Sequence, residues 1–331
     1  MARILMITGL ALTLAWSGFA CTSPADRTQK ELLAEAQRSA KQQALEVRSD
    51  RLGAERGEVE AQAALAERYA TGRGVEMDLA RAAQWYQRAA EQGDSESQYR
   101  LAILYDYGAG VGADPAQAIT WLRKAADQGH VKAQRQLGAM YDHGFGVPQD
   151  RAEAVRWYRE AAVRGDAQAQ AALAALYSGK EGVPPDHAEA AKWYRRAAEQ
   201  GGARDQYNLG VSYDMGLGLQ KDPSKAARWY RKAAEQGLPD AQYSLGQMYA
   251  EGRGVREDLV VAHMWLSLSV DAGFEIAHRA LVVLEHQLTA EQIGLAEAMA
   301  REWLAARAPE QAEDEEGRRA ADPRRRSPRA R

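Results

Sequence analysis

Histidine and carboxylate side chains are the first candidates for chemistry in this chain, because together they bind metal ions and transfer protons. Glu275 and His278 have the spacing of a carboxylate–histidine metal pair, but centres of that kind need two such pairs. No second Glu-x-x-His and no His-Glu-x-x-His stretch occurs. We therefore expect this pair to belong to a helix surface, and we expect no metal and no cofactor. The histidines are His130, His143, His187, His263, His278 and His286.

Nucleophilic catalysis is not indicated by the sequence either. Neither the Gly-x-Ser-x-Gly turn of serine hydrolases nor the Ser-x-x-Lys of penicillin-recognising enzymes occurs. Gly144 and Gly146 could suggest a phosphate-binding loop, but they follow a helical pattern and lack the Lys-Ser/Thr that such loops require. The sequence therefore predicts a protein that is not an enzyme, with no catalytic residue and no small-molecule substrate. A β-lactam or peptidoglycan hydrolase is kept as a remote alternative.

The elements that carry these residues form a repeat with a period of 36 residues. The stretch KWYRRAAEQG at 192–201 returns as RWYRKAAEQG at 228–237. Gln, Leu, Tyr, Asp, Trp and Gly each keep a fixed position through six copies without insertion or deletion. Such regularity indicates a protein of stacked units rather than one globular core. The largest recurring side chains are predicted to form the structural core of the repeats: Trp85, Trp121, Trp157, Trp193, Trp229 and Trp265.

Each copy has the pattern of two helices, which we call helix A and helix B, separated by glycine turns. In the copy at 94–129, a helical stripe around Leu101 ends at glycines, and Asp114 followed by Pro115 predicts the start of helix B. The Asp that recurs in every copy is accordingly predicted to be an N-cap. Gly129 stands where a helix end favours a left-handed residue. The small residues at 138, 210 and 246, all glycine, should let the helices approach closely.

The full residue set of one copy resembles a known family. It resembles Sel1-like repeats, which are relatives of the tetratricopeptide repeat with its period of about 34 residues. The resemblance extends over residues 57–273 and implies an all-α fold, a right-handed α-solenoid of six stacked helix-turn-helix repeats with helical caps. It also implies that helices A line a concave face. The residues that carry it in the third copy are Ala133, Gln134, Leu137, Gly138, Tyr141, Gly144, Gly146, Val147, Asp150, Ala154, Trp157, Tyr158, Ala161, Ala162 and Gly165.

The amino-terminal stretch MARILMITGLALTLAWSGFAC has the layout of a secretory signal peptide, with a weakly positive start, an apolar run and then small residues. The only cysteine, Cys21, follows Gly18-Phe19-Ala20, which resembles the lipidation site of bacterial lipoproteins. We expect a signal peptide at 1–20, then a lipidated linker and N-terminal capping helix at 21–56. The expected location is the periplasm, anchored to the outer membrane as a lipoprotein. Cleavage after Ala20, which would release a soluble periplasmic protein, is the alternative.

The carboxyl-terminal residues divide into two parts. Residues 274–306 are predicted to form capping helices, because Thr289 and Gln292 have the spacing of a capping box. Residues 307–331 contain an acidic cluster and then an Arg-rich end with almost no apolar residue, which predicts a disordered, solvated tail. The net charge of −3 and the export signal argue against a nucleic-acid partner.

Positions on helix A that vary among the copies are candidates for binding specificity. Tyr and Arg, which are frequent at binding hot spots, recur next to the fixed Gln. We predict that they form a peptide- or protein-binding strip made of Tyr99, Arg100, Arg135, Tyr207, Asn208 and Tyr243. The alternative is that the tyrosines only pack between neighbouring helices A.

The predicted function is therefore that of a non-catalytic adaptor or scaffold in the bacterial cell envelope. It would bind an envelope protein or peptide on the concave face and contact the membrane only through the lipid on Cys21. A soluble periplasmic regulator that sequesters a sensor or a secreted protein is the alternative.

Overall fold

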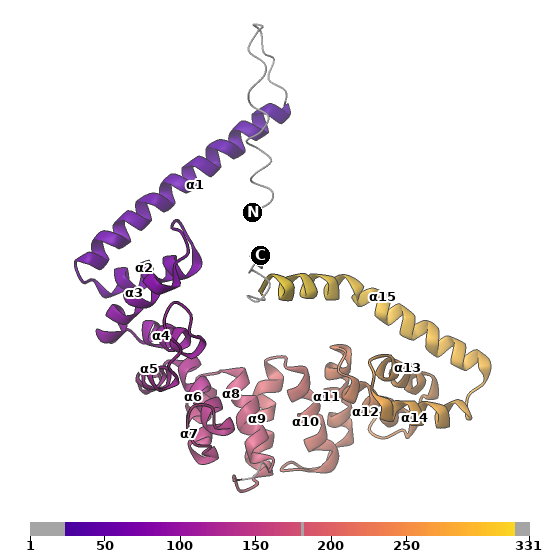
Figure 1. The fold of residues 1–331 in the computed structure, drawn as a ribbon. Coiled ribbons are helices and arrows are strands. Elements are labelled where there is room, and N and C mark those ends of the chain that lie inside the picture. Colours follow the sequence, from indigo (N-terminus) through magenta and orange to yellow (C-terminus); the bar gives the residue numbers. More distant parts are fainter. Residues whose placement is uncertain (1–23, 180–181, 322–331) are drawn as a thin grey trace, which may run out of the picture. The chain divides into compact units, whose positions relative to one another are not determined.

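The computed structural model describes residues 24–179 and 182–321, and every regular element within these ranges is an α-helix (Figure 1). The all-α fold predicted from the sequence is thus confirmed. The helices are α1 (Pro24–Glu55), α2 (Val59–Thr71), α3 (Leu79–Glu91), α4 (Ser95–Tyr107), α5 (Pro115–Asp127), α6 (Val131–His143), α7 (Arg151–Val163), α8 (Ala167–Tyr177), α9 (His187–Glu199), α10 (Ala203–Met215), α11 (Pro223–Glu235), α12 (Pro239–Ala250), α13 (Leu259–Asp271), α14 (Glu275–Glu285) and α15 (Ala290–Ala321).

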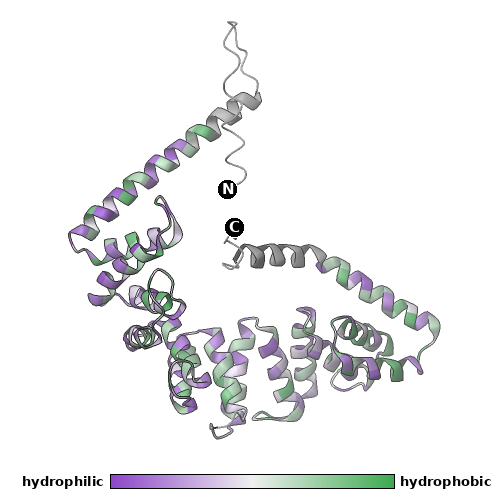
Figure 2. Ribbon diagram, viewed as in Figure 1, coloured by the Kyte–Doolittle hydropathy of each residue, from purple (hydrophilic) through white to green (hydrophobic). Residues whose placement is uncertain are grey.

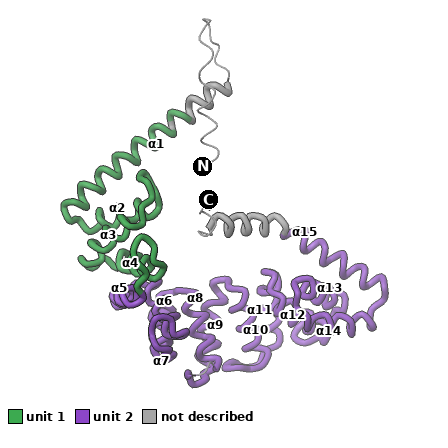
Figure 3. The backbone as a smooth tube through the Cα atoms, in the orientation of Figure 1, with its two compact units in different colours: residues 1–114 green, residues 115–331 purple. Residues whose placement is uncertain are grey.

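The chain divides into two compact units, Met1–Asp114 and Pro115–Arg331 (Figure 3). In the first unit α1, α2, α3 and α4 pack against one another in sequence order. In the second unit the same order holds from α5 to α14, and α15 packs against α13. Apolar residues are spread over all these helices rather than gathered in one of them (Figure 2). Each helix pair therefore buries its apolar faces against its neighbours, as stacked helix-turn-helix repeats do.

Aspartate side chains begin the B helices, as the sequence predicted. The carboxylate of Asp222 accepts a hydrogen bond from the backbone N–H of Lys225 at 3.0 Å, and Pro223 is the first residue of α11. This arrangement satisfies one of the backbone donors that a helix start leaves open. The same cap is made by Asp78, Asp150, Asp186 and Asp258. The predicted left-handed residue at Gly129 is confirmed by its φ of 85°.

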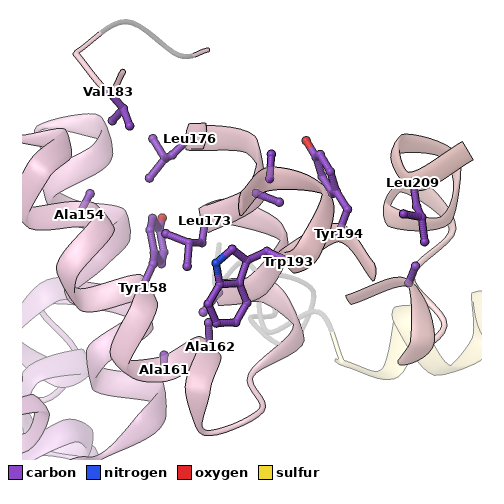
Figure 4. Close-up of a cluster of buried hydrophobic side chains, with 14 residues drawn as sticks. Ala154, Tyr158, Ala161, Ala162, Leu173, Leu176, Val183, Trp193, Tyr194 and Leu209 are labelled. Atoms are coloured by element: carbon purple, nitrogen blue, oxygen red, sulfur yellow. The ribbon is translucent and has the colours of Figure 1, made fainter. Parts of the chain in front are cut away.

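The core is built from leucine, alanine and aromatic positions. The recurring Leu of helix A is at most 1% exposed in all six repeats. Of the six tryptophans, Trp121, Trp157, Trp193 and Trp265 are buried, whereas Trp85 and Trp229 are only half-buried. Figure 4 shows Trp193 beside Ala162 and Leu173 within one buried cluster of the second unit. The tryptophan is therefore a buried core residue in four of the six repeats. In the other two, part of its ring is exposed to solvent.

A second aromatic position, directly after the tryptophan in four of the six repeats, was not identified from the sequence as core. It is occupied by Tyr86, Tyr158, Tyr194 and Tyr230, all at most 8% exposed. These rings lie against the small residues of helix A. A Cβ at Gly138 would come within 2.8 Å of the Tyr158 ring, and one at Gly210 within 2.6 Å of the Tyr230 ring. The predicted role of these glycines in close helix approach is therefore confirmed.

Buried glutamines link successive repeats through hydrogen bonds. Gln170 donates from Nε2 to the carbonyl oxygen of Ala162 at 3.0 Å, and its Oε1 accepts from Nε2 of Gln200 at 2.8 Å. The same network recurs one repeat later at Gln206 and Gln236. In the sixth repeat the residue that should donate to Gln242 is Ala272, and Gln242 Oε1 is buried without a hydrogen-bond partner in the described part of the chain. An unpaired buried acceptor of this kind destabilises a fold.

Replacing Ala272 with Gln should therefore stabilise the second unit. The new amide can donate to Gln242 Oε1 as Gln200 donates to Gln170, and the expected gain is about 1 kcal/mol, or about 2–4 °C in Tm. The thermal melt of Ala272→Asn is the matched control, because its amide is one methylene too short to reach. Equal Tm values for the two variants would contradict the hydrogen-bond explanation.

The helices at both ends of the repeats differ from the pattern inside. In the first unit, α1 packs on α2 through buried Val47 and Ala54, and Asp50 pairs with Arg68 at 2.5 Å. In the second unit, the predicted capping box begins α15: Gln292 Oε1 accepts from the N–H of Thr289 at 2.9 Å, and Thr289 Oγ1 accepts from the N–H of Gln292 at 3.3 Å. The boundaries assigned to the two capping regions remain predictions.

The tail predicted to be disordered from residue 307 differs in the structure, because α15 continues to Ala321. The residues between 307 and 321 are mainly Ala, Glu, Gln and Arg, which have high helix propensity. A lack of apolar residues is typical of disorder, but residues of these types can also form a polar helix. Residues 322–331, the signal peptide and Cys21 lie outside the described residues.

Candidate protein-binding surface

The predicted binding strip is divided between the two units. Tyr99 and Arg100 lie on α4 of the first unit, where Arg100 pairs with Glu96 at 2.6 Å on the helix surface. The remaining residues lie on the A helices of the second unit, in the same repeat position or next to it. They are Arg135 on α6, Tyr207 and Asn208 on α10, and Tyr243 on α12. The candidate surface is therefore built from the second unit alone.

Tyr207 packs between neighbouring helices, as the alternative prediction held. Its ring is half-buried and lies 5.5 Å from the ring of Tyr230 on α11. Burial raises the pKa of Tyr207. Asn208 beside it is half-buried, and its backbone carbonyl oxygen accepts from Ser212 Oγ. Tyr207 and Asn208 therefore contribute to the packing between helices more than to a surface that a partner could bind.

Arg135 also has a structural contact. Its Nε lies 3.3 Å from Oδ2 of Asp166, and Oδ1 of the same carboxylate accepts from the N–H of Ala169 at the start of α8. The guanidinium is only partly exposed, because it links α6 to the helix that follows one repeat later. Arg135 can therefore contribute positive charge to the surface, but the carboxylate of Asp166 neutralises part of it.

Tyr243 is the member of the strip that lines a hollow. Its ring lies 5.5 Å from the ring of Phe274, and its hydroxyl oxygen accepts from Nε2 of Gln247 at 2.6 Å. The hollow has a volume of about 480 Å³ and lies between α12 and α14, with Leu266 and Leu284 as buried lining. We call it the α12–α14 groove. Its remaining lining residues are Gln247, Ala250, Glu251, Ile276, Arg279, Ala280, Val283 and Gln287.

The α14 side of this groove was not identified from the sequence. Arg279 is 36 residues after Tyr243, so it continues the position of Tyr207 and Tyr243 into the capping region. The sequence pattern predicted only a cap for residues 274–306, because the fixed Gln, Gly and Trp of the repeat end before them. Counting the period one step further would have located Arg279 and its neighbours.

A cluster of His, Ser and Glu side chains near the groove has the composition of a catalytic site but not its geometry. His263 lies 3.2 Å from Ser267 Oγ and 3.3 Å from Glu285 Oε1. His263 is 2% exposed, and Ser267 is one turn away on the same helix. The backbone N–H groups around Ser267 are used inside α13, so they do not form the donor pair that stabilises an oxyanion. The contacts are those of a hydrogen-bonded core histidine.

Neither metal binding nor membrane spanning is indicated by the parts of the chain that the structure describes. No group of three His, Cys, Asp or Glu side chains there could hold a metal ion. No helix in residues 24–179 and 182–321 is both long and apolar enough to cross a bilayer.

Helix pairs that recur every 36 residues, packed in sequence and joined by glycine turns, define an α-helical repeat protein whose candidate site is a surface. The chain belongs to the Sel1 repeat family, whose repeat pattern matches residues 59–94, 95–130, 131–166, 167–202, 203–238 and 239–274. Proteins built of such repeats generally mediate protein–protein interactions and are typically non-catalytic scaffolds.

Two solved structures are similar to this chain in both sequence and fold. A protective antigen of uropathogenic Escherichia coli strains with an SLR fold is 37% identical over 81% of this chain, with a TM-score of 0.66. The chain spans 58% of the length of that protein. A Sel1 repeat protein from Oxalobacter formigenes is 32% identical over 65% of this chain and 88% of its own, with a TM-score of 0.57. No curated protein matched the chain.

Proposed function

We propose that the protein is a non-catalytic adaptor of the bacterial cell envelope that binds a protein partner on the A helices of its second unit. The observation that carries this proposal is the α12–α14 groove, in which Tyr243 and Arg279 stand beside exposed apolar side chains. Aromatic and Arg side chains around an apolar hollow are the usual composition of a binding hot spot. Tyr207, one repeat before Tyr243, packs against Tyr230 inside the stack.

The envelope location rests on the amino-terminal sequence. The apolar run followed by Gly18-Phe19-Ala20-Cys21 supports export and a lipid on Cys21, which would anchor the protein to the outer membrane from the periplasmic side. Mass spectrometry of the mature protein tests this location. A diacylglycerol-modified Cys21 is the expected amino terminus, whereas an unmodified residue after Ala20 would favour a soluble periplasmic regulator that sequesters a sensor or secreted protein.

Affinity capture after crosslinking in cells tests the binding role. We expect the wild-type protein to recover a specific envelope protein, and we expect the double variant Tyr243→Ser/Arg279→Glu to lose it while it remains folded in a thermal melt. Tyr107→Ser is the matched control, since Tyr107 is an exposed tyrosine of the first unit outside this surface. If the double variant recovers as much partner as the wild type, the partner does not bind at the groove.

A further inference from the structure

The exposed face of α14 carries two apolar side chains, Ile276 and Val283, that differ from the repeats in residue type or in exposure. Ile276 occupies the second position of its helix and is 58% exposed. Val283 lies two turns further along α14 and is 62% exposed. The residues at the position of Ile276 in the six repeats are all charged or amide side chains, namely Glu60, Glu96, Lys132, Gln168, Arg204 and Asp240. Ile276 therefore departs from the repeat pattern in residue type. Val283 departs in exposure, because the residues at its position in the six repeats are all half-buried. Both lie on the groove.

No helix of the described second unit covers this face of α14. Inside the repeats, each A helix packs against the B helix that follows it. The helix that follows α14 is α15, and it packs along α13 instead, where Trp303 meets Trp265 edge-on with ring centroids 5.9 Å apart. Val282, which stands where Gly246 packs against α13 in the preceding repeat, is 43% exposed. The packing that a following helix would give α14 is thus missing.

The walls of the groove favour a helix as its occupant. Both walls are α-helices, whose backbone N–H and C=O groups bond within the helix. The walls therefore offer an extended peptide no backbone edge with which to pair, only scattered polar side chains, among them Gln247, Arg279 and Gln287. A helix has its backbone groups already paired, and it can place apolar side chains one turn apart against Ile276 and Val283. The eleven residues of α14 would match about three turns of such a helix.

The charges at the groove favour an acidic residue on the partner. Glu251 is already paired with Arg253 at 3.0 Å. Arg279 is exposed and makes no ion pair within the described residues. A carboxylate on the partner could form the charge-assisted hydrogen bond that this guanidinium lacks.

We propose that the α12–α14 groove binds an amphipathic α-helix of a partner protein. Its apolar side chains pack against Ile276 and Val283, and an acidic side chain beside them pairs with Arg279. This inference rests on the proposed function and narrows it to one kind of partner segment at one end of the surface.

Synthetic peptides provide the test with the full-length protein. The probe is a fluorescent Ala-rich peptide of about 18 residues, long enough to hold a helix, with Leu and Glu on one face. A peptide of the same composition in scrambled order is its control. Fluorescence anisotropy should show binding of the patterned peptide only.

Arg279→Glu should weaken that binding about tenfold or more, and a peptide with Lys in place of Glu should recover it. Arg228→Glu, an exposed change on α11, should have no effect.

Four results would overturn the proposal. Equal binding of patterned and scrambled peptides would exclude a helix-specific groove, as would the absence of binding by either. If Arg279→Glu changes the affinity of neither the Glu-containing nor the Lys-containing patterned peptide, the charge pairing is excluded. A dimer in sedimentation equilibrium that Ile276→Asp dissociates would assign the apolar face to a second copy of the chain. If the peptides fail while cellular capture still depends on Tyr243 and Arg279, the adaptor function stands and only the helical partner is wrong.

Discussion

Replacing Trp193 with Ala is expected to destabilise the second unit by about 3–5 kcal/mol, the range for removing a buried aromatic side chain. Trp193 is 3% exposed and packs in the cluster formed by α7, α8 and α9. Its indole N–H also donates to Glu189 at 2.9 Å, and the Arg196 guanidinium lies 4.7 Å from the ring centre. The substitution removes all three interactions and leaves a cavity between helices that rigid neighbours cannot fill.

Thermal and denaturant unfolding measure this loss. Trp229→Ala is the matched control, since Trp229 holds the same repeat position but is only half-buried, and its loss should be smaller. A melt of Trp193→Ala within about 1 °C of the wild type would contradict the core role of the tryptophan.

Removing the carboxylate of Asp205 is expected to stabilise the protein at neutral pH. The third position of helix A is a fully buried alanine in three repeats of the second unit, Ala133, Ala169 and Ala241, whereas the fifth repeat has Asp205 there. Burial raises the pKa of Asp205 from 3.8 to about 6. Folding therefore favours the protonated form, and the ionised form destabilises the fold.

The raised pKa of Asp205 sets the direction in which the free energy of unfolding changes with pH. The stability associated with protonated Asp205 is complete below pH 3.8, falls as the pH rises towards 6 and is lost above it. Because the side chain is partly exposed, we expect Asp205→Ala to gain about 1–2 kcal/mol at pH 7.5. The gain should be smaller at pH 5. Asp205→Asn keeps the shape and removes the charge, so it should show the same trend. Gains that are equal at pH 5 and pH 7.5 would show that the charge is not the cause.

The repeat made most of the fold predictable from the sequence. A fixed period places the same residue in the same local environment six times, so the Asp N-caps and the Gly turns could be assigned without knowledge of any contact. Contacts between helices were harder to predict. The buried Tyr158 and Tyr230, each directly after a tryptophan, meet Gly138 and Gly210 on a neighbouring helix, and this pairing has no signature along the chain.

The candidate site was predictable only in part, for a related physical reason. Tyr207 and Tyr243 occupy the same repeat position, but one packs against Tyr230 and the other lines a groove. The difference arises from the helices that come next in the chain. After Tyr207 comes another complete repeat, whereas after Tyr243 comes α14 without a helix packed on its outer face. A position in a repeat therefore predicts the helix face on which a residue lies, but not the neighbours that it contacts at the end of the stack.

Site-specific photocrosslinking in cells tests the central claim, that the protein acts by binding a partner at the α12–α14 groove, most directly. A photoreactive amino acid would replace Ile276 in the groove, and in a parallel strain it would replace Arg228 on the B-helix surface of the same unit. Both residues are exposed, so neither change should unfold the protein. We expect one defined protein adduct from position 276 that the Arg279→Glu background abolishes, and none from position 228. The same adducts from both positions, or none from position 276, would contradict the claim.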